Sequence, residues 1–117
     1  MSDHRHERLN KVLHQLISQI VQFELGDQRL EGITIEYVTV SPDLRDATVF
    51  FSVFDEKKKN TTRMGLISAK RYLHRKIAES LNLRITPKLH FKYHDIENRA
   101  QHLQNIIEDE KPRYESD

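Results

Sequence analysis

The residues of this chain best suited to chemistry are its lysines and arginines. Between positions 57 and 92 there are eleven basic residues and one acid, Glu79, whereas the rest of the chain has eight basic residues and seventeen acids. One third of the sequence is therefore strongly positive, although the net charge of the whole is only +1. Ammonium and guanidinium groups at this density bind phosphate oxygens, which is the electrostatic signature of a nucleic-acid-binding protein.

These cations fall into two groups by position. A predicted helix and the segment after it carry the residues that we expect to contact the phosphate backbone of RNA: Lys70, Arg71, Arg75, Lys76, Arg84 and Lys88. A polar loop before that helix carries residues that we expect to steer RNA toward the surface: Lys57, Lys58, Lys59 and Arg63. Contacts of this kind provide affinity and orientation but read little sequence. A merely solvated face is the alternative, but such helices usually mix both signs to form i,i+4 pairs, and here only Glu79 is available.

Other chemistries lack their residues. The three glycines, Gly26, Gly32 and Gly65, cannot form a phosphate-binding loop or a dinucleotide fingerprint. There is no cysteine, and no serine lies in a Gly-x-Ser-x-Gly elbow. His90 and His94 lie four apart on a predicted strand, roughly 13 Å from each other, which is too far for one metal ion. We therefore expect no catalytic residue, no cofactor and no metal.

The elements that position the cations begin with an amphipathic helix over residues 5–25, which ends before Gly26. Its apolar residues recur at steps of three and four: Leu9, Val12, Leu13, Leu16, Ile17, Ile20 and Phe23. Residues 32–40 and 47–54 have the β-branched and aromatic composition of strands, and the turn residues 41–46 between them favour an antiparallel hairpin. Both strands also place apolar side chains on a second face, which we expect to be partly covered: Val38, Val40, Phe50 and Phe54.

The basic stretch supplies the remaining elements. A helix capped by Thr61 or Thr62 should run to about Leu81 on a stripe of Leu66, Ala69, Leu73, Ile77 and Leu81, with Arg71 and Arg75 pointing away from it. We expect the aromatic residues to lie in the core, except Tyr72, which is the best candidate for stacking on a base. Residues 88–94 alternate as a third strand with Leu89, Phe91 and Tyr93 inward and Lys88, His90, Lys92 and His94 outward.

The chain has the length of one domain. Asp95 should cap a short last helix through residues 96–107, and residues 108–117 should form a mobile acidic tail. The prediction is thus a single α+β domain over residues 1–117, with an ordered core of about 8–107. No apolar run approaches the roughly 20 residues of a membrane helix, and the N-terminus lacks the apolar core of a signal peptide. We expect a cytoplasmic monomer.

Four motifs resemble those of one family. Residues 24–30 read Glu-Leu-Gly-Asp-Gln-Arg-Leu, similar to the Glu-Leu-x-Asp-Pro-Arg-Leu that closes the first helix of ribosome-binding factor A proteins. Residues 33–44 resemble that family's first strand and hairpin turn, and residues 47–53 its second strand. Residues 83–91, Leu-Arg-Ile-Thr-Pro-Lys-Leu-His-Phe, resemble its Leu-Arg-x-x-Pro-x-Leu-x-Phe. The four motifs occur in the family's order and cover roughly residues 8–107.

The resemblance implies a type II KH-like fold, in which an Ala-x-Gly kink between two helices replaces the Gly-x-x-Gly loop of ordinary KH domains. It implies an assembly factor that binds the free 30S subunit and its 16S rRNA, near the 5′-terminal helix, and supports late maturation and rRNA processing without catalysis. Assembly GTPases are further candidate partners. Two positions depart from the family pattern: Gln28 replaces a proline, and Arg71 replaces the glycine of the kink.

Two other functions remain open on the sequence. A general RNA-binding KH module would normally carry the Gly-x-x-Gly loop that this chain lacks. A protein-interaction adaptor could instead use the acidic terminal segments. The assembly factor predicts selective binding to free small subunits, whereas the adaptor predicts protein partners in the absence of RNA.

Overall fold

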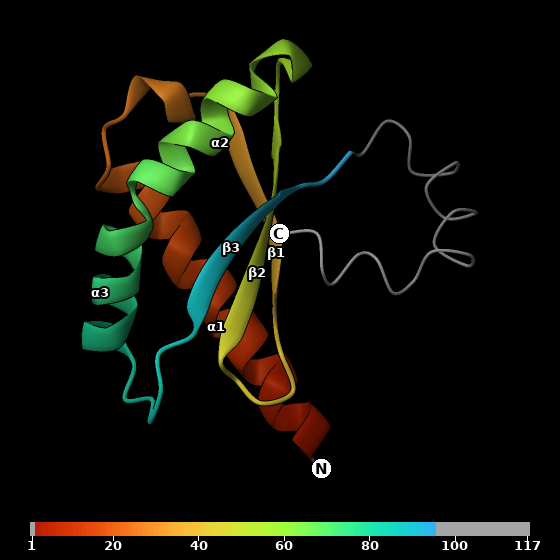
Figure 1. The fold of residues 1–117 in the computed structure, drawn as a ribbon, viewed down its shortest axis with the longest axis vertical. Helices are drawn as coiled ribbons and strands as arrows, with labels where there is room; N and C mark the ends of the chain where they lie inside the picture. Colours follow the sequence, from red (N-terminus) through yellow and green to blue (C-terminus); the bar gives the residue numbers. More distant parts are fainter. Residues whose placement is uncertain (1, 96–117) are drawn as a thin grey trace.

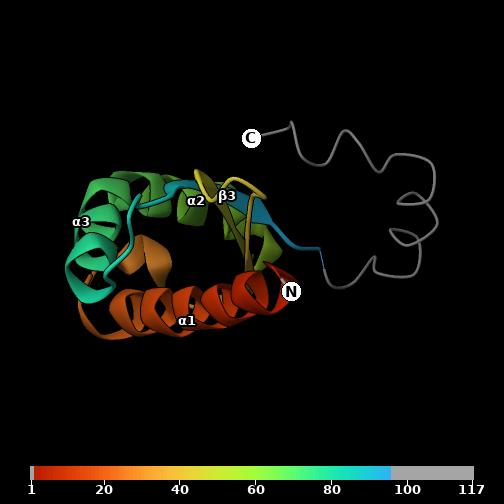
Figure 2. The ribbon, with the colours of Figure 1, turned by 90° about the horizontal axis from the view of Figure 1, so that it is seen from below.

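The computed structural model describes residues 2–95, which form a three-stranded sheet with helices packed on one face (Figure 1, Figure 2). The elements in chain order are α1 (Ser2–Phe23), the 3₁₀ helix η1 (Gln28–Leu30), β1 (Ile33–Val40), β2 (Asp46–Val53), the 3₁₀ helix η2 (Glu56–Lys58), α2 (Lys59–Ser68), α3 (Lys70–Ser80) and β3 (Lys88–Tyr93). The predicted last helix and the predicted mobile acidic tail lie outside the described residues. No helix within residues 2–95 is both long and apolar enough to cross a bilayer.

The sheet has the order β1-β2-β3 and mixes both strand directions. β1 and β2 pair antiparallel, which confirms the predicted hairpin. β2 and β3 pair parallel, and a parallel connection needs a crossover. α2 and α3 provide that crossover, so the basic stretch of the sequence passes over the edge of the sheet that β3 forms (Figure 1).

The core lies between this sheet and the helices. The inward residues of β2 and β3, such as Phe51 and Leu89, meet Ile17 of α1 and Leu73 of α3, and all four are almost fully buried. Burying one such side chain stabilises the fold by about 1.5–3 kcal/mol. Phe23, which the helical pattern placed in the core, is instead 76% exposed because α1 ends there, and Val21 is buried.

A β-bulge between Ile35 and Tyr37 changes which face of β1 each side chain occupies. Ile35 and Val38 both point into the core, so Val38 does not lie on the second face as expected. Tyr37 lies on the outer face, where its ring stacks on Phe50 with centroids 4.4 Å apart. Its exposure of 41% contradicts the expected core position.

The single helix predicted up to Leu81 is two helices that break at Ala69. The backbone there has φ −89° and ψ 0°, a bridge conformation that residues other than glycine can adopt. Helical hydrogen bonding resumes at once, because the N–H of Leu73 donates to the carbonyl oxygen of Ala69. The kink implied by the resemblance is therefore present, although Arg71 stands where the family has glycine.

Neither predicted threonine caps α2. The helix begins at Lys59, preceded by Lys58, and no side chain caps it. Thr62 lies inside the helix and is fully buried. Its Oγ1 has no hydrogen-bond partner within the described part of the chain.

Candidate nucleic-acid interface

The cations predicted to contact phosphate lie along α3 and the segment that leads to β3. Arg71, Arg75, Arg84 and Lys88 are exposed, while Lys70 and Lys76 are half-buried. Because Leu73 and Ile77 bury the opposite side of α3, Arg71 and Arg75 share its outer side, one helical turn apart. The structure therefore presents two guanidinium groups together on one exposed helix face, as the sequence predicted.

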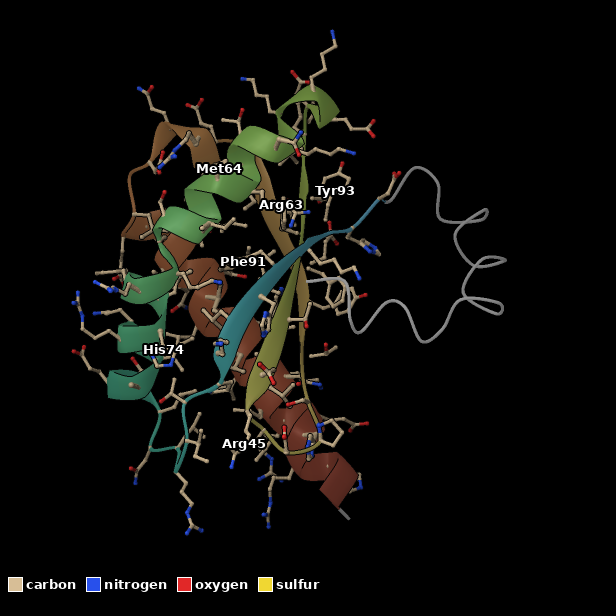
Figure 3. All side chains as sticks on the ribbon, viewed as in Figure 1. Arg45, Arg63, Met64, His74, Phe91 and Tyr93 are labelled. Carbon is tan, nitrogen blue, oxygen red and sulfur yellow. The ribbon has the colours of Figure 1, made fainter. Side chains whose placement is uncertain are left out.

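The cations at the start of the basic stretch differ in exposure. Lys57 and Lys58 belong to η2 and are exposed. Arg63 is half-buried against β3: its Nη1 donates to the carbonyl oxygen of Phe91 at 2.8 Å, and its guanidinium lies 5.8 Å from the centroid of the Phe51 ring (Figure 3). This arginine attaches α2 to β3, so its guanidinium is less available for RNA than the loop prediction assumed.

Two lysines flank Arg63 and continue the same contact with β3. Lys59 Nζ lies 5.2 Å from the centroid of the Tyr93 ring. Lys70 Nζ lies 5.8 Å from the centroid of the Phe91 ring. Cation–π contacts of this kind contribute about 0.5–1 kcal/mol at exposed sites and position the ammonium groups. A row of three positive side chains therefore runs from the start of α2, across the helix break, beside β3.

Tyr72 joins α3 to the end of α1 instead of serving as an exposed stacking platform. Its hydroxyl donates to Glu24 Oε1 at 2.5 Å, and Lys76 Nζ lies 3.8 Å from the same oxygen. The hydrogen bond to the Glu24 carboxylate raises the pKa of Tyr72. The Tyr72 ring also has the guanidinium of Arg75 at 5.4 Å and Lys76 Nζ at 5.9 Å from its centroid. The ring is half-buried, which contradicts the expected exposure.

The turn after α1 forms the support on which α2 rests. Asp27 accepts hydrogen bonds from the Arg29 backbone and guanidinium, and these lower the pKa of Asp27. This carboxylate caps η1, so the turn forms although Gln28 replaces the family's proline. A Cβ placed on Gly65 of α2 would lie 2.9 Å from Leu30 Cδ2 and 3.2 Å from Arg29 Cβ. Gly65 therefore allows the close approach of α2 to η1.

Two of the histidines, His14 and His90, hold parts of the fold together. His90 Nε2 lies 2.8 Å from Asp46 Oδ1 across the parallel strands. His14 Nε2 donates to the carbonyl oxygen of Ile35 at 2.6 Å. No group of three His, Cys, Asp or Glu residues within the described range could hold a metal ion.

Some of these residues could not be chosen from spacing alone. Glu24 and Tyr72 are 48 residues apart, and only the fold brings them together. The structural role of Arg63 likewise depends on the parallel placement of β3. Gly65, by contrast, had a signal, since a glycine inside an apolar helical pattern often marks a close approach.

The chain is similar to proteins of one family along nearly its whole length. The profile of the family described as Ribosome-binding factor A matches residues 5–107. A curated relative of that name from Citrifermentans bemidjiense is 37% identical over 107 residues, which are 90% of this chain and 89% of the relative.

Solved structures give the same result. The crystal structure of ribosome-binding factor A from Thermus thermophilus matches with a TM-score of 0.70 and 27% identity, over 75% of this chain and 93% of that one. A homology model of the Thermus thermophilus protein, fitted into the cryo-EM map of a complex with the 30S subunit, matches with a TM-score of 0.61 and 28% identity, over 71% and 88%. With the mixed sheet and the helix break, these similarities confirm the predicted type II KH-like fold.

Proposed function

This chain belongs to the ribosome-binding factor A family, and from that premise we propose that it binds the free 30S subunit and assists its late maturation. The observation that carries the proposal is the family match over residues 5–107. The fitted complex of the Thermus thermophilus relative with the 30S subunit supports the same partner.

The interface that we propose is the exposed basic side of α3 with the segment that follows it. Arg71, Arg75, Arg84 and Lys88 are all exposed, so their charged ends can reach phosphate oxygens without unpacking the core. Lys70 and Lys76 border them, and Lys57 to Lys59 extend the positive surface. Arg63 contributes by holding α2 on β3, not as a principal phosphate contact.

The proposed mechanism uses the energy of binding to the rRNA and involves no catalytic step. The protein stabilises whichever conformation of the 16S rRNA it contacts better, because a ligand shifts an equilibrium only by its difference in affinity for the two states. Near the 5′-terminal helix of the rRNA, such a preference would support processing of the precursor ends. The protein acts as a cytoplasmic monomer with no cofactor and no catalytic group, and an assembly GTPase is a candidate for its release.

Co-sedimentation with ribosomal particles tests this function. The protein should sediment with purified free 30S subunits and much less with whole 70S ribosomes at the same salt concentration. Equal partition onto both particles would contradict the assembly-factor function and favour a general RNA-binding module. Failure to bind either particle, together with capture of proteins after nuclease treatment, would favour the adaptor.

A further inference from the structure

β1 is an edge strand, and α1 covers only part of its free edge. Asn10 Oδ1 accepts a hydrogen bond from the backbone N–H of Val40 at 3.0 Å. One turn further along α1, His14 Nε2 donates to the carbonyl oxygen of Ile35 at 2.6 Å. Proteins commonly protect strand edges in this way, because unpaired backbone groups otherwise pair with another chain. Within residues 2–95, the bond to Ile35 is the last of this kind toward the start of β1.

Toward the start of β1, from Ile35 back to Ile33, the backbone of β1 points outward, and no side chain among the described residues covers it in this way. The N–H of Phe54 donates to the carbonyl oxygen of Gly32 at 3.0 Å, so these two residues form a hydrogen-bonded pair. Antiparallel pairs alternate, so the next pair, Ile33 with Val53, directs the N–H and C=O of Ile33 away from β2. By the same alternation the N–H of Ile35 points outward and the N–H of Thr34 points toward β2.

A groove of about 620 Å³ lies along this stretch of the edge. It opens because α1 crosses the sheet at an angle and its C-terminal end diverges from β1 (Figure 1). Three segments line it: the last turns of α1, the turn around η1 without Arg29, and residues 32–35 at the start of β1. Val21, Leu30 and Ile35 are buried and give it an apolar floor.

Backbone donors and acceptors along an open strand edge recognise an extended polypeptide, which adds to the sheet as a further strand. The charges of the groove indicate which kind. Among the residues that the structure describes, Asp27 and Glu31 line it and no lysine or arginine does, although the chain as a whole has 19 basic and 18 acidic residues. Asp27 is paired with Arg29, and Glu31 is exposed. This charge disfavours RNA and favours a cationic peptide.

We propose that the β1 edge at Ile33, within this groove, binds an extended basic peptide segment of a protein partner as an added strand. The peptide backbone pairs with the N–H and C=O of Ile33 and with the N–H of Ile35, and a basic side chain faces Glu31. None of the groove residues belongs to α2, α3 or the predicted RNA-contacting cations. The protein can therefore hold RNA and peptide with separate residues.

Amide hydrogen exchange followed by NMR tests the proposal on the full chain. The probe is the capped peptide Lys-Val-Lys-Val-Lys-Val, and its matched control is Glu-Val-Glu-Val-Glu-Val. The basic peptide should slow exchange at Ile33 and Ile35 several-fold and leave Thr34 unchanged, because the Thr34 amide already faces β2. Unchanged exchange at Ile33 and Ile35 at millimolar peptide, or equal effects of the two peptides, would overturn the proposal.

Variants provide the second arm. Ile33→Pro removes the outward N–H at a position where an edge strand tolerates proline, and Ile33→Val keeps it. Ile33→Pro should lose the peptide response while Ile33→Val retains it. If Ile33→Pro does not fold, Glu31→Lys takes its place, because Glu31 is exposed and its substitution leaves the core intact. Glu31→Lys should weaken the exchange response to the basic peptide, and Glu31→Gln should weaken it less. Glu31→Lys should also leave 30S co-sedimentation unchanged, which separates this proposal from the proposed function.

Discussion

Arg71 is the residue at which surface charge and backbone geometry meet. It lies in the first turn of α3, two residues after the break at Ala69, and shares an exposed helix face with Arg75. Its position at the family's glycine adds a guanidinium group beside the helix break. Because the break is made by the bridge conformation of Ala69, the charge is gained without loss of the two-helix arrangement.

Reversing both charges on this face tests its role in binding RNA. Arg71→Glu with Arg75→Glu should weaken binding to the free 30S subunit by about tenfold or more, because two phosphate contacts become repulsions. Filter binding or co-sedimentation at fixed salt measures the affinity. Arg5→Glu with Arg8→Glu is the matched control, since both arginines are exposed on α1 and the change in net charge is the same. Equal losses of 30S affinity in the two double variants would show that the interface does not lie on α3.

At Thr62 we predict a substitution that makes the fold more stable. The fully buried hydroxyl of Thr62 has no partner among the described residues, and an unsatisfied buried polar group costs about 1–3 kcal/mol. Thr62→Val replaces the hydroxyl with a methyl group of similar size. The free energy of unfolding should therefore rise by about 1 kcal/mol in urea denaturation. Thr61→Val, at an exposed position of the same helix, should change it little, and a stability loss in Thr62→Val would reveal a hidden hydrogen bond.

At the residue scale, the sequence predicted which side chains face outward better than it predicted which residues they contact. Arg71 and Arg75 follow from helical spacing alone, because Leu73 and Ile77 define the buried side. Tyr72 and Arg63 do not, since their partners Glu24 and Phe91 lie 48 and 28 positions away. A basic residue in such a stretch can also bind groups within the protein. Only the packing of α2 on β3 shows that Arg63 does so.

α2 is the element that depends most on one close approach. It rests on η1 through Gly65, where a side chain would meet Leu30 and Arg29. The same turn is held by Asp27, so the motif of residues 24–30 builds a support for the helix that leads into the break. The direction in which α3 presents its arginines follows from this support at one end and from the Tyr72–Glu24 hydrogen bond along its side.

Replacing Gly65 with a larger residue should therefore weaken the packing of α2 on η1. Gly65→Val should lower the free energy of unfolding by about 1–3 kcal/mol, because overpacking forces Leu30 and Arg29 to move. Gly65→Ala should cost less, since about 1 kcal/mol of improved helix propensity offsets the smaller clash. Thermal and urea denaturation measure both, with Ile67→Val as an exposed control on the same helix. A stabilised Gly65→Val would show that α2 does not rest on η1.

Element types were predictable from the sequence where periodicity was strong. The pattern of residues 5–25 and the alternation of residues 88–94 gave α1 and β3 within a few residues. The break at Ala69 left no local signal in propensity, because alanine favours helix, and only the resemblance to the family implied it. The bulge in β1 also escaped the pattern, since one extra residue reverses the alternation and moves Val38 into the core.

Positive and negative charges are unevenly distributed along the sequence. Eleven of its 19 basic residues lie between positions 57 and 92, from η2 to β3, while seventeen of its 18 acids lie elsewhere in the sequence. Such a distribution orients the protein as it approaches a polyanion and speeds association at low salt. Sequence revealed this imbalance in full, but the fold was needed to separate exposed cations from those that hold α2 on β3.

Salt dependence measures how many of these cations act together. If Arg71, Arg75, Arg84 and Lys88 each displace a counterion, the logarithm of the 30S affinity should fall against the logarithm of salt concentration with a slope of roughly −3 to −4. Titrations between low and physiological salt provide the slope. A value near zero would mean that apolar contacts, and not phosphates, supply the affinity.

The break at Ala69 has an evolutionary consequence. Because Ala69 bends the chain without help from residue 71, selection can exchange the amino acid at position 71 and keep both helices. Arginine at this position is compatible with both helices and adds a positive charge. On the proposed function, a single codon thus adjusts how long the protein stays on its target. An assembly factor of the proposed kind must leave before its target is used, so the time of departure is as much a selected trait as the act of binding.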